Sequence, residues 1–378
     1  MVQEKPRRIF ISAAETSGDA HAAALARALP AALPGAVCTG IGGDAMAAAG
    51  VRLMENVTSR SAMLGHALGQ AGFYWRLLGR VKRSFREERP DVVVVVDSPA
   101  WNFHVALAAK KLGIPVLYYI APQLWAWGAW RVKKLRRAAD RVACILPFEE
   151  EWFARREIKA TYVGHPLFDD RHVKAAARAG NPGGRFPTVA LLPGSRGHEI
   201  ERLWQPMQEV AAALRKTYPD ARFLSAAAHE ATAAELRRTA DPELAIEVRR
   251  TGIEAVTRYA DLALVASGTA TLEVAAQACP MIILYHIHPL AWNLVGRWLI
   301  KTPHLSLVNI LAGRALVPEY MPFYHQTAQV AQEALALLEN EPLRRQTQAD
   351  LAALMQPLMK PGAAARVAGM VRELLPLY

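Results

Sequence analysis

The sequence contains little cysteine and no long apolar run. Among its 378 residues are only three cysteines, Cys38, Cys144 and Cys279, and their wide spacing matches neither a zinc site nor a redox motif. No stretch has the roughly 18 consecutive apolar residues of a membrane-spanning helix, and the first residues lack the pattern of a signal peptide. No repeat of fixed period is present, which excludes solenoids and propellers. We therefore expect a cytoplasmic protein that is soluble or bound peripherally to a membrane.

Acidic residues are outnumbered by basic ones. The chain has 45 lysines and arginines against 34 aspartates and glutamates, a formal charge of +11. Such a surplus favours nucleic acid, an anionic bilayer or phosphate-bearing substrates, and charge alone does not choose among them. With 52% hydrophobic and 21% charged residues, the composition is that of a globular protein, and the length suits two domains.

Short apolar segments alternate with helical ones, which predicts an α/β fold with parallel sheets covered by helices on both faces. The five valines at 92–96 are typical of a strand buried on both faces. The expected strands span residues 8–14, 37–41, 92–96, 114–121, 142–145 and 161–163, then 188–192, 222–225, 244–248, 262–266 and 281–285.

Glycine, proline and basic residues interrupt this alternation between residues 168 and 187, as in a linker. We therefore expect two doubly wound, Rossmann-like domains. The first spans residues 1–167 and the second 168–354. The chain is expected to be helical from residue 327, with a last helix at about 355–378 that packs back on the first domain.

Ligands of doubly wound sheets bind beyond the carboxyl ends of the strands, so the turns there are candidate sites. The first turn runs from Glu15 to Asp19, before a helix expected at 19–29. Gly18 permits close approach to a ligand, and Ser17 or Asp19 can cap the helix. Capping leaves Glu15 unexplained. The usual dinucleotide-binding fingerprint is absent.

The second turn begins at Asp97, directly after the five valines. A carboxylate at the end of a buried strand is costly unless it is solvated, paired or used. One alternative is a simple Asx turn. Because the residue lies at the edge where ligands bind, we interpret Asp97 as a general base. Asn102 either binds sugar hydroxyls or caps the next helix.

The turn that opens the second half contains Gly194, Ser195 and Arg196. Free backbone N–H groups at a helix N-terminus attract anions, and an arginine fork suits phosphate. A diphosphate is therefore the expected ligand. A plain strand-to-helix turn would not need Arg196.

A fourth turn, with Ser267, Gly268 and Thr269, also follows an apolar strand. Glu273 lies in the first turn of the next helix, where it either complements the helix dipole or accepts two ribose hydroxyls. Residues 306–314 show no pattern that demands a function, so they are expected to form a loop.

Three clusters combine aromatic with basic residues, as helices at a membrane interface do, although a core helix with a solvated basic face would look similar. Together they favour an anionic membrane surface over nucleic acid. The clusters are Phe73, Tyr74, Trp75, Arg76, Arg80, Lys82 and Arg83; Trp125, Trp127, Trp130, Arg131, Lys133, Lys134, Arg136 and Arg137; and Trp292, Arg297, Trp298 and Lys301.

The chain resembles the lipid-A-disaccharide synthase family (glycosyltransferase family 19) over nearly its whole length. The order and spacing of several segments carry the resemblance: AETSGD at 14–19, DSPAWN at 97–102, YYIAPQLWAW at 118–127, LPFEEEWF at 146–153, VGHP at 163–166, LLPGSR at 191–196, ASGTATLE at 266–273 and LVNILAGRALVPE at 307–319. The resemblance implies a GT-B fold, whose two domains face a central cleft. It also implies that the first domain binds mainly the acceptor and the second binds UDP.

The resemblance further implies an inverting, metal-independent transfer without a cofactor. UDP-2,3-diacylglucosamine and 2,3-diacylglucosamine 1-phosphate would give the β-1,6-linked disaccharide 1-phosphate and UDP, at the cytoplasmic face of the inner membrane. The expected partners are these two substrates and the anionic membrane surface, not nucleic acid. The sequence leaves open whether the chain forms a homodimer.

Residue by residue, the resemblance makes Asp97 the candidate base for the acceptor 6-hydroxyl, with Glu15 and Asp19 as further catalytic residues beside the reacting sugars. Asn309 and Arg314 match a segment beside the nucleotide, which makes them site residues despite their unremarkable pattern. The predicted substrate and nucleotide contacts are Ser17, Gly18, Asn102, Gly194, Ser195, Arg196, Ser267, Gly268, Thr269, Glu273, Asn309 and Arg314. No metal ligand is predicted.

The chain departs from the family pattern at several places, none of which affects Asp97, Arg196 or Glu273. Ala14 stands where the family often has glycine, and Ala100 where many relatives carry an acidic residue. A glutamate common in the family is replaced by Ala67 or Leu68.

Two alternatives remain at this point. One is another GT-B enzyme for a UDP-sugar, such as a 2-epimerase or a glycan transferase. The other is a nucleic-acid-binding protein, which leaves the carboxylates of Asp97 and Glu273 unexplained because carboxylates repel phosphates.

Overall fold

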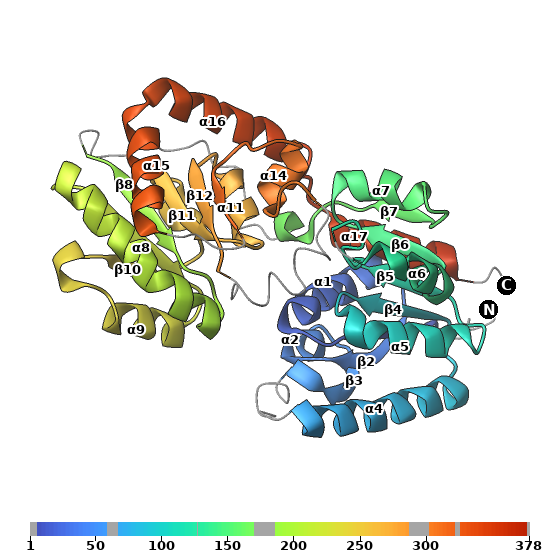
Figure 1. Cartoon of the computed structure of the whole chain (residues 1–378). Helices are drawn as coiled ribbons and strands as arrows, with labels where there is room; N and C mark the ends of the chain where they lie inside the picture. The colour runs from blue at the N-terminus through green and yellow to red at the C-terminus, as the bar shows by residue number, and fades with distance from the viewer. Residues whose placement is uncertain are drawn as a thin grey trace. The chain divides into compact units, whose positions relative to one another are not determined.

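The computed structural model describes residues 6–58, 67–126, 128–169, 186–286, 302–321 and 326–375 (Figure 1). The chain divides into two compact units, Met1–Asp169 with Lys360–Tyr378, and Asp170–Met359. Each unit contains one sheet, and all strand pairs described are parallel. The predicted α/β class with two doubly wound sheets is therefore confirmed.

The first unit has a seven-stranded sheet of order β3-β2-β1-β4-β5-β6-β7. Its strands are β1 (Arg8–Ala13), β2 (Val37–Gly42), β3 (Arg52–Asn56), β4 (Val92–Val96), β5 (Val116–Tyr119), β6 (Arg141–Cys144) and β7 (Ala160–Tyr162). The strand order reverses between the neighbours β1 and β4, which pair in register with Ala13 opposite Val96. The turns after these two strands consequently lie side by side at the carboxyl edge of the sheet.

The valines of β4 alternate between two apolar cores, as expected for a strand buried on both faces. Val93 and Val95 pack with α4 (Ala67–Glu87), α5 (Pro99–Lys110), α6 (Val132–Ala138) and α7 (Pro147–Ala154). Val92, Val94 and Val96 pack on the other face with α1 (Thr16–Ala32), α2 (Asp44–Ala48) and α17 (Ala363–Leu374). All five valines are fully buried.

The last helix, α17, is fixed to this unit by polar contacts at its first turn. The Asp169 carboxylate accepts hydrogen bonds from the main-chain N–H groups of Gly362, Ala363 and Ala364, at 2.7–2.8 Å. The Arg366 guanidinium donates to the carbonyl of Val163 at 2.8 Å. A carboxylate at a helix N-terminus is favoured by both capping and the helix dipole.

The second unit has a six-stranded sheet of order β10-β9-β8-β11-β12-β13, which reverses between β8 and β11. Its strands are β8 (Thr188–Leu192), β9 (Arg222–Ala227), β10 (Glu247–Arg250), β11 (Leu262–Ala266), β12 (Met281–Leu284) and β13 (Glu319–Tyr320). One core packs the sheet against α8 (Gly197–Thr217), α9 (Glu230–Arg238) and α15 (Thr327–Glu339). Elsewhere in the unit, α11 (Ala270–Ala276) contacts both α14 (Leu307–Ala312) and α16 (Glu341–Met355).

Three local predictions were wrong. Helix α1 begins at Thr16 and not near Asp19, so Glu15 occupies the N-cap position without a side-chain capping bond. Strand β10 starts at Glu247, because Asp241 and the following proline begin a 3-10 helix, Pro242–Leu244, where the strand was expected. A loop was expected at residues 306–314, but Leu307–Ala312 form the helix α14, whose N-terminus is capped by the Ser306 side chain.

Candidate functional site

The turn after β4 has an unusual backbone. Asp97 and Ser98 both have positive φ angles, 51° and 44°. Two consecutive non-glycine residues in the left-handed region are costly, so the surrounding structure must hold them in place. Such strain is often found at functional turns.

A buried hydrogen-bond network holds this turn. The Asn102 amide donates to the main-chain carbonyls of Val96 and Asp97, each at 2.8 Å, and to that of Ser12 at 3.3 Å. Its oxygen accepts from the Ser12 hydroxyl at 2.8 Å, which in turn accepts from the Trp101 indole at 3.1 Å. The Tyr118 hydroxyl also donates to the Asp97 carbonyl, at 3.0 Å.

This network excludes Asn102 as the cap of α5, which begins before it. Its side chain is 0% exposed and its amide hydrogens already meet three carbonyls, and its contact with a sugar stays a prediction. We regard Asn102 as a positioning residue. Ser12 and Tyr118, which share that role, were not predicted. The only sequence signal for Tyr118 is its place at the start of the YYIAPQLWAW segment.

The surroundings of the Asp97 carboxyl group raise its pKa. Burial raises its pKa above the ordinary value of 3.8, the N–H of Ser98 opposes that rise, and the negative charge of Glu15 adds to it. Glu15 and Asp97 therefore lie close enough to interact, at the ends of the neighbouring strands β1 and β4. A carboxyl group with a raised pKa is a better proton acceptor than an exposed aspartate.

A pocket of about 590 Å³ adjoins this turn within the first unit. Its walls are largely apolar and come from the loop after β1, from α4 and from the start of α5. They are formed by Ala14, Glu15, Tyr74, Trp75, Leu78, Ser98, Ala100, Trp101 and His104. Pockets of roughly 300–1,000 Å³ with few polar groups are typical of small-molecule sites.

The other predicted residues of the first loop, Ser17, Gly18 and Asp19, have different surroundings. The Asp19 carboxylate accepts from the N–H groups of Gly43, Ala45 and Met46 at 2.7–3.2 Å and is 4% exposed. Asp19 thus anchors the start of α2, and its catalytic role stays a prediction. Ser17 is exposed in the first turn of α1, and Gly18 packs against the end of β4.

In the second unit, the turns after β8 and β11 line one pocket of about 430 Å³. Its lining includes every residue predicted on these two turns: Gly194, Ser195, Arg196, Ser267, Gly268, Thr269 and Glu273. The reversal of strand order between β8 and β11 brings the two turns together, as β1 and β4 do in the first unit.

Glu199 modifies the expected diphosphate site. Its carboxylate accepts from the N–H groups of Ser195 and Arg196, at 3.1 and 3.2 Å, and forms a 3.2 Å ion pair with the Arg196 guanidinium. Two of the N–H groups expected to meet an anion are therefore occupied by this capping carboxylate. The Arg196 side chain is 69% exposed and remains the main cationic group of the turn.

Glu273 lies in a partly desolvated position in the same pocket. Burial, with a contribution from the nearby Glu254, raises its pKa to about 7. Its side chain lines the pocket and forms no hydrogen bond among the described residues. An acceptor in this state is suited to hydroxyl donors, because bonds to hydroxyls would recover what burial costs.

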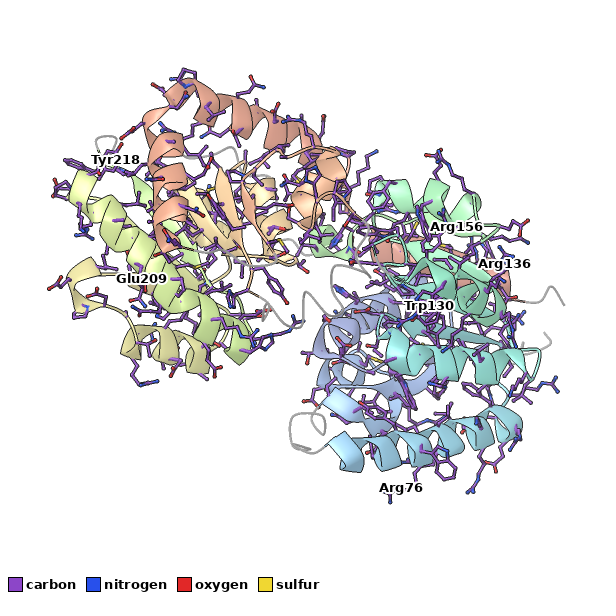
Figure 2. All side chains as sticks on the ribbon, in the orientation of Figure 1. Arg76, Trp130, Arg136, Arg156, Glu209 and Tyr218 are labelled. Carbon is purple, nitrogen blue, oxygen red and sulfur yellow. The ribbon has the colours of Figure 1, made fainter. Side chains whose placement is uncertain are left out.

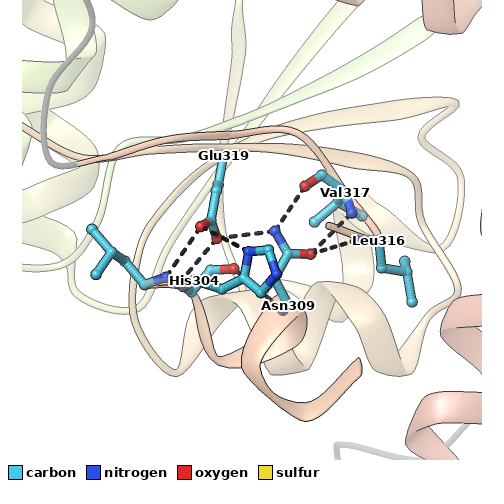
Figure 3. A network of polar contacts seen from close by, with 7 residues as sticks. His304, Asn309, Leu316, Val317 and Glu319 are labelled. Carbon is cyan, nitrogen blue, oxygen red and sulfur yellow. Dashed lines mark hydrogen bonds and ion pairs between the residues drawn. The ribbon is translucent and has the colours of Figure 1, made fainter. Parts of the chain in front are cut away.

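Asn309 and Arg314 have protein partners in this structure, and their predicted nucleotide contacts stay predictions. Neither lines the pocket. Asn309 is 0% exposed, donates to Val317 and Glu319 at 2.9 Å each, and accepts from the N–H groups of Leu316 and Val317 (Figure 3). Arg314 forms a 2.6 Å ion pair with Asp350. Asn309 therefore braces the segment between α14 and β13.

The first two aromatic–basic clusters belong to the first unit. Trp75 on α4 and Trp130 before α6 are 79% and 71% exposed. Figure 2 shows Arg76 projecting from α4 away from the sheet, with Trp130 and Arg136 on the side that carries α5 and α6. Trp125 is different, because its indole donates to the buried Glu149 at 2.9 Å. Trp127 and the third cluster, residues 292–301, lie outside the described residues.

Within the described parts of the chain, no helix is long and apolar enough to cross a bilayer. The same residues contain no cluster of three potential metal ligands.

Comparison with known proteins gives these sites a family context. Residues 9–371 match the family described as lipid-A-disaccharide synthetase. The lipid-A-disaccharide synthase of Syntrophotalea carbinolica is 36% identical over 98% of this chain and 96% of its own, and that of Anaeromyxobacter dehalogenans strain 2CP-1 is 38% identical over 96% of both.

Solved structures share the fold. MurG of Acinetobacter baumannii superposes with a TM-score of 0.59 at 18% identity, over 97% of this chain and 100% of its own. The UDP-GlcNAc 2-epimerase of Neisseria meningitidis gives 0.62 at 12% identity, over 98% and 99%. With a near-complete family match and relatives above one-third identity, the chain belongs to the lipid-A-disaccharide synthase family of GT-B glycosyltransferases.

Proposed function

We propose that this protein transfers 2,3-diacylglucosamine from UDP to the 6-hydroxyl of 2,3-diacylglucosamine 1-phosphate. The products are the β-1,6-linked disaccharide 1-phosphate and UDP. The observation that carries the proposal is the half-buried Asp97 carboxyl group, held in a strained turn beside an apolar pocket. That combination suits a base acting on a hydroxyl of a lipid acceptor.

In this reaction the acceptor oxygen attacks C1 of the donor sugar, and its proton passes to the Asp97 carboxylate. The bond between C1 and the diphosphate oxygen breaks as the new glycosidic bond forms, so the configuration at C1 inverts. Asn102 and Tyr118 contribute by fixing the main-chain carbonyl of Asp97, which limits the positions of its carboxylate.

The pocket of the second unit is the proposed UDP site. Glu273 accepts hydrogen bonds from the ribose hydroxyls, and the exposed Arg196 fork binds the diphosphate. UDP leaves as an anion, so Arg196 and the N-terminus of α8 also stabilise the leaving group. No metal is needed for these steps.

We further propose that the protein works at the cytoplasmic face of the inner membrane. The exposed Trp75 and Trp130, with the basic side chains of α4 and α6, form the membrane-contact surface. Exposed indoles insert at the interface, while the cations attract anionic headgroups.

The proposal is tested by incubating the purified protein with both substrates, detergent and EDTA, and detecting the tetraacyl disaccharide 1-phosphate by mass spectrometry. We expect product from the wild type and none above background from Asp97→Asn. Failure to form product, together with conversion of acyl-free UDP-GlcNAc, would instead indicate a 2-epimerase or another glycan transferase.

The nucleotide site is tested separately by calorimetry. Arg196→Ala should weaken UDP binding by at least about tenfold while leaving uridine binding unchanged, because uridine lacks the diphosphate. Arg238→Ala is the matched control, since Arg238 is also an exposed arginine paired with a glutamate three positions away, Glu235, in the same unit. Equal loss with both variants would argue against a diphosphate site at Arg196.

A further inference from the structure

Ser98 has a buried hydroxyl that none of the roles above uses. The residue is 3% exposed, and its Oγ has no hydrogen-bond partner among the described residues. Buried polar groups are nearly always paired, so an unpaired hydroxyl in a native site needs an explanation. Ser98 also lines the 590 Å³ pocket, which means that a ligand there could reach it.

The surroundings of Ser98 divide the pocket into a polar and an apolar part. Ser98 and Glu15 belong to the turns after β4 and β1, next to Asp97. Tyr74, Leu78 and Trp101 supply apolar surface, and the rings of Tyr74 and Trp101 lie 5.2 Å apart. A ligand that fills this pocket therefore has a polar head near the turn and an apolar remainder.

The negative charge beside the pocket limits which polar group of a ligand can bind near the turn. A hydroxyl can donate to a carbonyl oxygen, whereas an ionised carboxylate only accepts. Glu15 carries negative charge beside the pocket, which disfavours a phosphate or a free fatty acid through repulsion. A neutral ester or amide carbonyl at the head of an alkyl chain satisfies both conditions.

We infer that this pocket holds one acyl chain of the acceptor, and that the Ser98 hydroxyl donates a hydrogen bond to the acyl carbonyl oxygen. The identity of the acceptor rests on the proposed function. Ser98 is then a substrate-binding residue that orients the sugar relative to Asp97. The size of Leu78 at the pocket wall contributes to the choice of chain length.

The test measures the Kd of a detergent-free, short-chain 2,3-diacylglucosamine 1-phosphate by calorimetry. Ser98→Ala should weaken binding about fivefold to tenfold, the effect of one buried hydrogen bond. Ser98→Gly controls for the backbone, because glycine tolerates the φ angle of 44° better than alanine does. Both variants should lose the same affinity.

Two further arms locate the effect. Acyl-free glucosamine 1-phosphate should bind wild type and Ser98→Ala equally, since it has no acyl carbonyl. Leu78→Trp, which fills the pocket, should weaken binding of the diacyl acceptor more as its chains lengthen. Wild-type affinity in Ser98→Ala, or a loss in Ser98→Ala that Ser98→Gly restores, would overturn the inference.

A parallel transfer assay separates this inference from the proposed function. If the wild type forms product but Ser98→Ala binds the acceptor normally, the inference fails and the proposed function stands. If the variants lose affinity as expected but the wild type forms no product, the pocket assignment stands and the proposed reaction fails.

Discussion

The phenolic hydroxyl of Tyr118 donates a 3.0 Å hydrogen bond to the main-chain carbonyl of Asp97. The next residue, Tyr119, faces the other core of the sheet, and its buried hydroxyl has no partner among the described residues. Two adjacent buried tyrosines thus differ in whether they contact the turn that carries the proposed base.

This difference gives a matched pair of variants. Tyr118→Phe should lower kcat about fivefold to tenfold with little change in the KM for either substrate, because it frees the Asp97 turn without touching a ligand. Tyr119→Phe removes an equally buried hydroxyl and should leave kcat unchanged. Steady-state kinetics on both proteins checks this, and equal effects would contradict a positioning role for Tyr118.

The pH dependence of kcat/KM should reveal the raised pKa of Asp97. The carboxyl group accepts a proton only when it is ionised, so activity should fall as the pH drops through a pKa above 3.8. Glu15→Gln removes a neighbouring negative charge and should therefore shift this acid limb to lower pH. An acid limb that stays in place in Glu15→Gln would show that Asp97 is not the titrating group.

We expect Glu273 to lower the stability of the folded protein while it contributes to UDP binding. Its folded pKa of about 7 exceeds the ordinary 4.5, so between these pH values the folded protein binds more protons than the unfolded chain. Stability consequently falls as the pH rises through this range, and the full cost is present above pH 7. Glu273→Gln should raise the free energy of unfolding at about pH 8 by up to about 3 kcal/mol while abolishing UDP binding.

Chemical denaturation of the wild type and Glu273→Gln near pH 4 and pH 8 measures the difference in stability, and UDP titrations measure the difference in affinity. At the lower pH the carboxyl group is protonated in both the folded and the unfolded chain, so the two proteins should differ little in stability. Unchanged UDP affinity in Glu273→Gln would remove Glu273 from the nucleotide site.

Membrane contact should depend on the two exposed tryptophans of the first unit. The double variant Trp75→Ser, Trp130→Ser should float with anionic vesicles at least about tenfold less than the wild type, because it loses the indoles that insert at the interface. Leu343→Ser is the control, since Leu343 is 45% exposed on α16 of the second unit. Equal flotation of all three proteins would contradict the proposed surface.

The sequence alone was sufficient to predict where most of the strands and the turns that follow them lie. Apolar strands of high β-propensity, such as the five valines of β4, are recognisable locally, and each ends at a polar or glycine-containing turn. The predicted residues after β8 and β11 line one pocket, and Asp97 lies beside another. These predictions depended on chain order and on the general rule for doubly wound sheets.

The sequence could not show which polar side chains are already satisfied within the protein. Asp19, Asn102 and Asn309 have the residue types of a binding site, yet their hydrogen-bonding capacity is used by backbone groups of α2, of the Asp97 turn and of the segment before β13. Those partners are up to 90 residues distant in sequence, as for the bond between Ser12 and Asn102.

Only the tertiary structure determined the surroundings of the polar side chains at these turns. The pairing of β1 with β4 places Glu15 beside Asp97 and so adds to the rise in its pKa. Packing also buries the Ser98 hydroxyl at the edge of a pocket, with no hydrogen-bond partner in the described part of the chain. Local sequence determines the strands and their turns, whereas burial and long-range hydrogen bonding determine which polar groups remain available to a ligand.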